Sequence, residues 1–221
     1  MPKSTAKART SPRRGRPRLT ADDEDAFRAK VMEEARRLFA QDGVAAVSMR
    51  RIAVAVGCSP MAIYRYFSSR DEILRGIWGD FFDDLFARLQ PLARRRGPAR
   101  RRLLALCRAY LDYWFEHPDR FRMIYLHQDQ IAPGERYYVD ASAVVERYWM
   151  FMQVIAEAQA EGDAPAGNTE RLGEALLCLL HGIALNLITI PEYPWQDREA
   201  LLRAALAGVL PGRGNPDAQS A

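Results

Sequence analysis

The stretch SMRRIAVAVGCSPMAIYRYF, residues 48–67, constrains the fold of this chain more than any other. Ser48 suits the N-cap of a short helix that has one apolar face. Gly57 then supplies a turn, because glycine adopts positive φ angles at low steric cost. Ser59 and Pro60 suit the N-cap and the first position of a second short helix. The pattern therefore predicts two short helices that cross at a tight turn.

The second of these helices is predicted to have a buried side and a polar outer side. Ile63 and Phe67 are four residues apart and are expected to point at a core. The residues left to project outward are Met61, Ala62, Tyr64, Arg65 and Tyr66. Four arginines and no acidic residue lie between Asp42 and Asp71, as expected of a surface that approaches phosphates. Taken alone, the pattern fits a helix-turn-helix, or an ordinary helical hairpin whose tyrosines cover the core.

The rest of the chain is predicted to be helical, because apolar residues recur at helical spacing and no stretch alternates as a strand does. Expected helices cover residues 26–42, 69 to about 89, 99–116, 119–126, 137–162, 169–189 and 196–208, with Pro91 and the ARRRGPARRR stretch as a break. The expected fold class is all-α, with a three-helix helix-turn-helix DNA-binding domain and a larger helical bundle for ligand binding and dimerisation. The expected boundaries are an arm at 1–20, the DNA-binding domain at 21–68, the bundle at 69–210 and a disordered tail at 211–221.

The N-terminal arm is strongly basic. The whole chain has a formal net charge of +4, yet residues 1–18 alone carry seven basic residues and no acidic one. Such an arm often binds nucleic acid. Its RRGRPR segment resembles the core of an AT-hook, in which arginines enter a narrow minor groove, here Arg14, Arg16 and Arg18. The alternative interpretation is a disordered, solubilising tail.

Several classes of protein are disfavoured by what the sequence contains. The three cysteines are far apart and form no CxxC pair, which argues against a disulfide framework or zinc site and favours the cytoplasm. The longest apolar run, ALLCLLHGIALNLITI, falls short of the roughly 20 residues of a membrane span. No apolar segment follows the basic N-terminus, so a signal peptide is not expected. The three histidines lack metal spacing and no catalytic constellation is recognisable, so we expect no metal, no cofactor and no enzyme.

One long amphipathic helix followed by VSMRRIAVAVGCSPMAIYRYFSSRDEIL resembles the N-terminal DNA-binding domain of the TetR family of transcriptional regulators. The resemblance covers about residues 24–80. The matching features are a glycine, then Ser/Thr-x-x-x-Ile-Ala, Gly-x-Ser, Tyr-x-His/Tyr-Phe, and a charged pair followed by Glu-Leu/Ile. The resemblance implies a homodimer on double-stranded DNA with a pseudo-palindromic operator, controlled by an unknown small-molecule effector.

The resemblance also implies roles for single residues. The leading edge of the second helix is expected to face base edges, through Ser59, Pro60, Met61 and Ala62. Phosphate contacts are expected from Ser48, Tyr64, Tyr66 and Arg70. Many members of the family carry a polar residue near the helix tip, whereas Pro60 and Met61 are apolar. We therefore expect Met61 or Ala62 to touch a thymine methyl group and Arg65 to donate to guanine. The alternative for Arg65 is a solvated or phosphate-bound side chain.

The C-terminal half resembles the WHG-type C-terminal domain of the same family, through YLDYWFEHPDRFRMIY and the His-Gly pair in LLCLLHGIALNL. The resemblance implies an effector-binding domain. Aromatic residues beside a few polar groups are typical of a small-molecule pocket, and the candidate residues are Tyr110, Trp114, His117, Tyr125, His127, Tyr148, Trp149, Met152 and His181. The alternative is that most of them form plain core, and that His181 is a satisfied core or interface histidine.

A stripe of leucines on the last two helices predicts a four-helix dimer interface, formed by Leu172, Leu176, Leu179, Ile183, Leu187, Leu202 and Leu206. The sequence thus favours a homodimeric repressor that a small molecule releases from DNA by tilting the fourth helix. Two alternatives remain: a non-specific architectural DNA-binding protein that uses the arm alone, and a helical-bundle enzyme.

Overall fold

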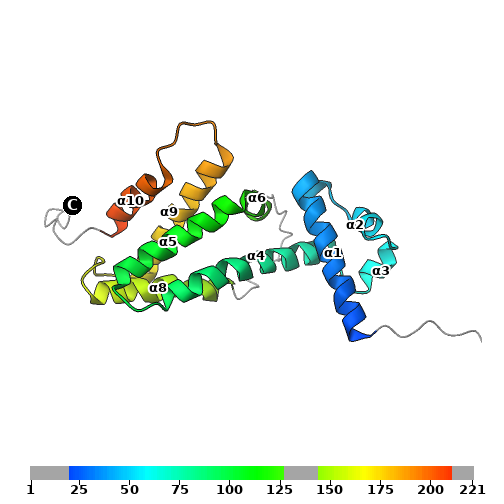
Figure 1. The fold of residues 1–221 in the computed structure, drawn as a ribbon, viewed down its shortest axis with the longest axis horizontal. Coiled ribbons are helices and arrows are strands. Elements are labelled where there is room, and N and C mark those ends of the chain that lie inside the picture. The colour runs from blue at the N-terminus through cyan, green and yellow to red at the C-terminus, as the bar shows by residue number, and fades with distance from the viewer. Residues whose placement is uncertain (1–19, 127–143, 211–221) are drawn as a thin grey trace, which may run out of the picture.

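The computed structural model describes residues 20–126 and 144–210, and within these ranges every regular element is a helix, which confirms the all-α class (Figure 1). The elements are α1 (Ala21–Asp42), the 3-10 helix η1 (Val44–Ala46), α2 (Met49–Val56), α3 (Pro60–Tyr64), α4 (Arg70–Ala93), α5 (Ala99–Glu116), α6 (Pro118–Tyr125), α8 (Val144–Ala160), α9 (Thr169–Thr189) and α10 (Arg198–Val209). The arm residues Arg14, Arg16 and Arg18, the pocket candidate His127 and the tail 211–221 lie outside the described residues.

The N-terminal helices enclose one hydrophobic core. Helix α1 begins at a capping box, in which Thr20 accepts from the Asp23 N–H and the Asp23 carboxylate accepts from the Thr20 N–H. Its buried face, with Val31 and Phe39, packs against α2 and α3, where Ile52 and Ile63 are fully buried. This core fixes the angle between the two short helices.

The C-terminal helices enclose a second core, built from α5, α8, α9 and α10. Trp114 and Phe151 are fully buried at its centre, and Leu176 and Leu202 close it from α9 and α10. Large aromatic side chains supply much of its buried apolar area, which stabilises the fold at roughly 25 cal/mol per Å².

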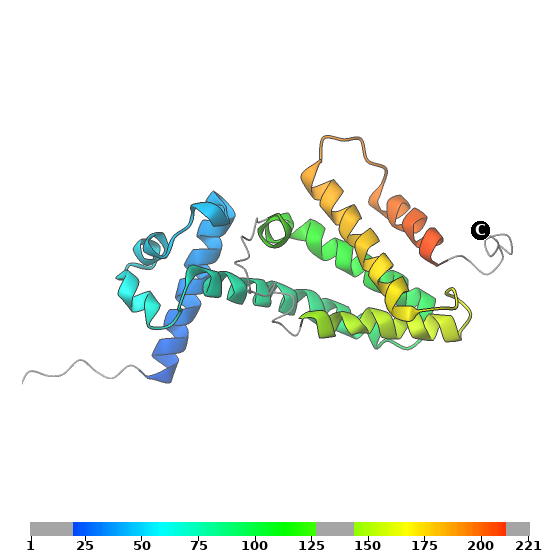
Figure 2. The same ribbon diagram turned by 180° about the vertical axis from the view of Figure 1, so that it is seen from behind.

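Helix α4 takes part in both cores, and Figures 1 and 2 show it running from α1 and α3 into the C-terminal bundle. Residues up to Phe81 contribute to the first core, and residues from Phe82 to Leu89 contribute to the second. Helix α6 also touches both, since Phe121 belongs to the second core and Met123 to the first. The expected boundaries at residues 20, 68 and 210 stay predictions.

Two sequence-based expectations about helix ends were wrong. Helix α4 continues through Pro91 to Ala93, because a proline in the last turn removes only one backbone hydrogen bond while Leu92 still packs on the core. Helix α3 ends at Tyr64 rather than Phe67, so Arg65 and Tyr66 lie in the turn that follows it. At the start of α4 the Ser69 hydroxyl accepts from the Glu72 N–H, and the Glu72 carboxylate accepts from the Ser68 N–H.

Candidate functional site

The turn between α2 and α3 has the geometry that its sequence predicts. Gly57 is left-handed, at φ 78° and ψ 38°, and the N–H groups of Gly57 and Cys58 both donate to the carbonyl of Ala53 at 3.0 and 2.9 Å. Ser59 then caps α3 by accepting from the Ala62 N–H at 3.3 Å. Ala53 is 1% exposed, and its small side chain permits the close crossing of the two helices.

The outer surface of α2 and α3 is exposed, and it carries apolar side chains and arginines that form no ion pair with described residues. Val54 is 76% exposed, Met61 73% and Tyr64 48%. Arg50 and Arg65 are exposed too, and neither forms an ion pair within residues 20–126 or 144–210. We call these five residues the α2–α3 face. Exposed apolar side chains beside unpaired arginines indicate a surface that contacts another molecule.

Helix α1 holds the α2–α3 face from behind. Arg28 donates to the carbonyl of Tyr66 at 2.8 Å, and Lys30 donates to the carbonyl of Val56 at 3.0 Å. The Phe27 and Tyr66 rings lie 5.0 Å apart. The Arg28 bond lies across 38 residues of chain and satisfies the Tyr66 carbonyl just past the end of α3.

The four residues predicted to contact phosphates occupy different environments. Tyr64 points outward, whereas Tyr66 is half-buried against Phe27. Ser48 caps α2 through the Arg51 N–H. Arg70 donates to the carbonyls of Val44 and Val47 at 3.2 and 3.3 Å and pairs with Asp71, which fastens the start of α4 to the loop before α2.

Arg50 is a candidate that the sequence analysis did not single out. It is exposed in the first turn of α2, two positions after the Ser48 cap. That position places its charge beside the positive end of a helix, where a phosphate is favoured. Its position relative to the cap is the signal that could have identified it.

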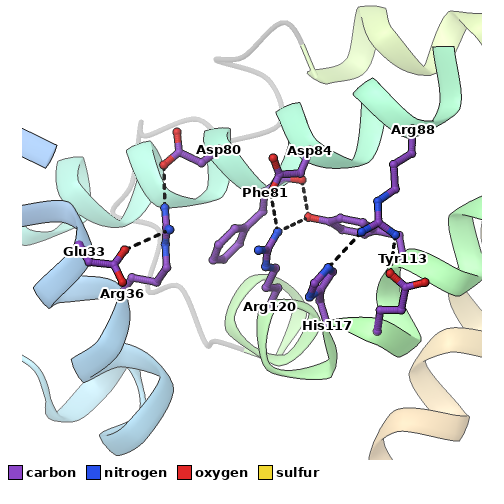
Figure 3. A network of polar contacts seen from close by, with 10 residues as sticks. Glu33, Arg36, Asp80, Phe81, Asp84, Arg88, Tyr113, His117 and Arg120 are labelled. Atoms are coloured by element: carbon purple, nitrogen blue, oxygen red, sulfur yellow. Dashed lines mark hydrogen bonds and ion pairs between the residues drawn. The ribbon is translucent and has the colours of Figure 1, made fainter. Parts of the chain in front are cut away.

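A network of ion pairs ties the middle of α4 to three other helices (Figure 3). Arg36 of α1 reaches Asp80 at 2.8 Å, and Arg120 of α6 reaches Asp84 at 2.7 Å. The Tyr113 hydroxyl of α5 donates to the Phe81 carbonyl at 2.6 Å and accepts from Arg120 at 2.9 Å. Desolvation raises the pKa of Asp80 despite its arginine partner. The network fixes the orientation of α4 relative to α1 and α6.

Five of the predicted pocket residues come together inside the second core. The Trp114 ring lies 6.2 Å from Tyr110 and 5.6 Å from Tyr125, and the Tyr125 ring lies 4.2 Å from His181, between ring centroids. Tyr148 joins them from α8, and hydrogen bonds among the tyrosine hydroxyls affect their pKa values. We call Tyr110, Trp114, Tyr125, Tyr148 and His181 the aromatic cluster.

Burial governs the titration of the aromatic cluster. Desolvation raises the pKa of Tyr110 to about 12 and that of Tyr125 and Tyr148 well above the usual value. Desolvation lowers the pKa of His181, so its imidazole is neutral near pH 7. The cluster is therefore an uncharged, hydrogen-bonding region inside an apolar core.

The other described pocket candidates lie elsewhere. His117 ends α5, and its Nε2 lies 3.5 Å from an Arg88 guanidinium nitrogen (Figure 3). Trp149 is 50% exposed. Met152 packs between α8 and α9, where its sulfur occupies the space beside Gly173. Among the described residues, no group of three histidine, cysteine or acidic side chains is placed to hold a metal ion.

The predicted dimer stripe divides between two environments. Leu176, Leu202 and Leu206 are buried in the core of their own chain. Leu179 is 38% exposed, and Leu172, Ile183 and Leu187 are half-buried. Helix α9 is apolar and long enough to span a membrane by length and composition alone; it packs against α5, α8 and α10.

Two models of known families match the chain. Residues 31–77 match the model described as bacterial regulatory proteins of the tetR family, and residues 103–209 match a tetracyclin repressor-like C-terminal domain. Together the two matched segments cover more than half of the chain.

Individual relatives agree with these matches. The HTH-type transcriptional regulator Rv1816 of Mycobacterium tuberculosis is 32% identical over 149 residues, 64% of this chain and 61% of that regulator. The chain thus spans about three fifths of the length of this relative. The HTH-type transcriptional repressor KstR2 of Mycobacterium tuberculosis is 26% identical over 136 residues, 61% of this chain and 68% of that repressor. A protein of unknown function from Rhodococcus sp. RHA1 shares the fold, with a TM-score of 0.68, 25% identity, and coverage of 83% of this chain and 95% of that chain.

Proposed function

Since the chain belongs to the TetR family and is a DNA-binding transcriptional regulator rather than an enzyme, we propose that it is a cytoplasmic, homodimeric repressor that a small molecule releases from its operator. The similarity to KstR2, whose name describes a repressor, supports the direction of control.

The observation that carries the proposal is the α2–α3 face. It exposes Met61, Tyr64 and two arginines that form no ion pair with any described residue, on a helix pair to which α1 donates two hydrogen bonds. Arginines can donate hydrogen bonds to guanine edges and phosphates, and an exposed methionine can make apolar contact with a thymine methyl group. Because the helix is short, few side chains reach the bases, and Arg65 is the strongest candidate for direct readout.

The proposed dimer pairs α9 with α9 of a second copy. The outer face of this helix carries small or apolar residues, including Ala175, Cys178, Leu179 and Gly182, and a Cβ added at Gly182 would meet no neighbour within the chain. Burial against the identical face of a second copy would remove these apolar side chains from water. A twofold axis there would present two α2–α3 faces to one duplex, and successive major grooves require them about 34–36 Å apart.

In the proposed release of the repressor from DNA, α6 couples the ligand-binding site to the DNA-binding face. Tyr125 of this helix belongs to the aromatic cluster and Phe121 contacts it, Met123 lies in the N-terminal core, and Arg120 binds α4. A ligand that moves α6 would therefore change the tilt of α4 and the spacing of the two faces. The ligand must bind the tilted state more tightly, and by linkage DNA must weaken ligand binding by the same factor.

Binding-site selection from a random DNA library tests the DNA-binding part of the proposal. We expect enrichment of a pseudo-palindrome whose half-sites are about one helical turn apart. An architectural protein that uses the arm alone would enrich A·T-rich DNA without symmetry. A variant lacking residues 1–18 is the control, since it should select the same palindrome with lower affinity. Selection of A·T-rich DNA alone, abolished by removal of the arm, would contradict the proposal.

A further inference from the structure

The aromatic cluster contains a buried donor that no residue in the described part of the chain satisfies. Trp114 is fully buried, and its indole Nε1 has no hydrogen bond of acceptable geometry within the described ranges, although the Tyr110 hydroxyl lies near it. An unsatisfied buried N–H costs about 1–3 kcal/mol, so such groups are rare without a functional reason. The Trp114 ring lies among the aromatic rings of Tyr110, Phe121 and Tyr125.

No charged side chain faces this donor from the described residues. The pKa values of Tyr110, Tyr125 and Tyr148 are shifted by burial and by neighbouring tyrosines and Trp114, and that of His181 by burial alone. Asp84 of α4 and Arg120 of α6 pair with each other, and Arg120 also donates to the Tyr113 hydroxyl (Figure 3). A ligand carboxylate or ammonium would thus be buried without a counter-ion, which is strongly unfavourable.

We propose that the aromatic cluster binds a neutral, largely apolar molecule that presents a hydrogen-bond acceptor, such as a ketone or ester carbonyl, to Trp114 Nε1. The rings of Trp114, Tyr125 and His181 supply flat apolar contacts, and the indole N–H supplies orientation. This inference rests on the proposed function, of which it names the class of effector. It makes charge, rather than size, the main criterion by which the site excludes ligands.

Four naphthalene probes that differ only in the side group test this inference: 2-acetylnaphthalene, 2-ethylnaphthalene, 2-naphthoate and 2-naphthylmethylammonium. Binding to the full chain is measured by calorimetry at neutral pH without DNA. We expect the ketone to bind most tightly and the two ions to bind more weakly by roughly tenfold or more, because of desolvation. Trp114→Phe should lower the affinity for the ketone by roughly 2- to 13-fold, since a hydrogen bond contributes about 0.5–1.5 kcal/mol. The affinity for 2-ethylnaphthalene, which has no acceptor, should stay unchanged.

Trp149→Phe is the matched control, because it makes the same ring change at an exposed position of α8 and should leave all four affinities unchanged. If circular dichroism shows that Trp114→Phe does not fold, the unaltered chain carries the comparison, because there the ketone should bind more tightly than 2-ethylnaphthalene by roughly 2- to 13-fold. Equal or tighter binding of either ion, equal weakening of both neutral probes in Trp114→Phe, or no binding of any probe would overturn the inference. Because no DNA is present, such a failure leaves the operator-binding experiment unaffected, and a failure to select an operator leaves this titration interpretable.

Discussion

Arg65 is the residue on which base recognition depends most in this account. Its guanidinium is exposed just past the end of α3 and forms no ion pair among the described residues. Arg65→Ala should lower operator affinity by about 1–3 kcal/mol and relax the preference at one base pair in each half-site. Tyr64→Ala should lower the affinity for all DNA sequences alike, because a phosphate contact carries no base information. Titration of the selected operator and its single-base variants checks both, and unchanged affinity in both variants would show that the α2–α3 face does not bind DNA.

His181 should make the stability of the second core depend on pH. Burial against Phe121 and Tyr125 lowers its pKa in the folded state. Below the unfolded pKa of about 6.5 the unfolded chain binds more protons, so stability falls as pH falls through that value, by at most about 1.4 kcal/mol per pH unit for one proton. The free energy of unfolding, measured by urea titration between about pH 7.5 and 5, should depend less on pH in His181→Gln.

The variant His117→Gln serves as a comparison for this effect. The pKa of His117 is lowered by desolvation, with Arg120 and Arg88 adding to the shift, but this residue is less enclosed than His181. Its replacement should reduce the pH dependence by a smaller amount. An undiminished pH dependence in His181→Gln would show that the imidazole is not buried in the neutral form.

At the residue level, the sequence predicted the exposure of a side chain correctly where that exposure depends on neighbours within one helix. The prediction was wrong where exposure depends on contacts with residues far away in the chain. The outward direction of Met61 and Tyr64 follows from the register of α3 with Ile63. The half-burial of Tyr66 depends on Phe27, and the engagement of Arg70 depends on two carbonyls more than 20 residues away. The spacing of residue types along the sequence does not show such contacts between distant residues.

At the level of elements, the same distinction separates the turn from the helix ends. The turn at Gly57 could be predicted, because its left-handed residue, its cap and its first-turn proline are adjacent in the sequence. The placement of Tyr66 after α3 could not, because its contacts with Arg28 and Phe27 come from α1. The gathering of the aromatic cluster from α5, α6, α8 and α9 was predicted only as a list of candidates, since sequence spacing does not show which faces of separate helices meet.

Arg120 is the side chain that connects α6 with α4 most directly. Its side chain is 21% exposed, bonds to Asp84 and the Tyr113 hydroxyl, and stacks on Phe81 at 4.7 Å. Arg120→Gln should lower the free energy of unfolding by about 1–2 kcal/mol, as expected when charged hydrogen bonds are removed. It should also weaken operator binding, because α4 becomes free to tilt.

Arg203→Gln provides the matched control, since Arg203 pairs with Glu199 on the surface of α10 with 69% of its side chain exposed. Its replacement should change stability by less than about 0.5 kcal/mol. Chemical denaturation and operator titration of the two variants give the comparison. Equal effects of both changes on operator affinity would remove Arg120 from the proposed connection.

At the scale of the whole molecule, the basic arm should contribute affinity rather than specificity. Its seven basic residues precede α1, which supports the α2–α3 face. Replacing Arg14, Arg16 and Arg18 by alanine should flatten the plot of log K against log salt by roughly 0.9 for each phosphate that the arm no longer neutralises. Fluorescence anisotropy at several salt concentrations measures the slope, and an unchanged slope would identify the arm as a solubilising tail.

Two α2–α3 faces, one from each subunit, are proposed to bind one duplex at a fixed spacing. The most direct test is the affinity for the selected operator compared with the same operator carrying five extra base pairs between its half-sites. Five base pairs turn one half-site to the opposite side of the duplex and move it by about 17 Å, so affinity should fall to the level of unrelated DNA. Affinity that is unchanged by the insertion would contradict this proposal.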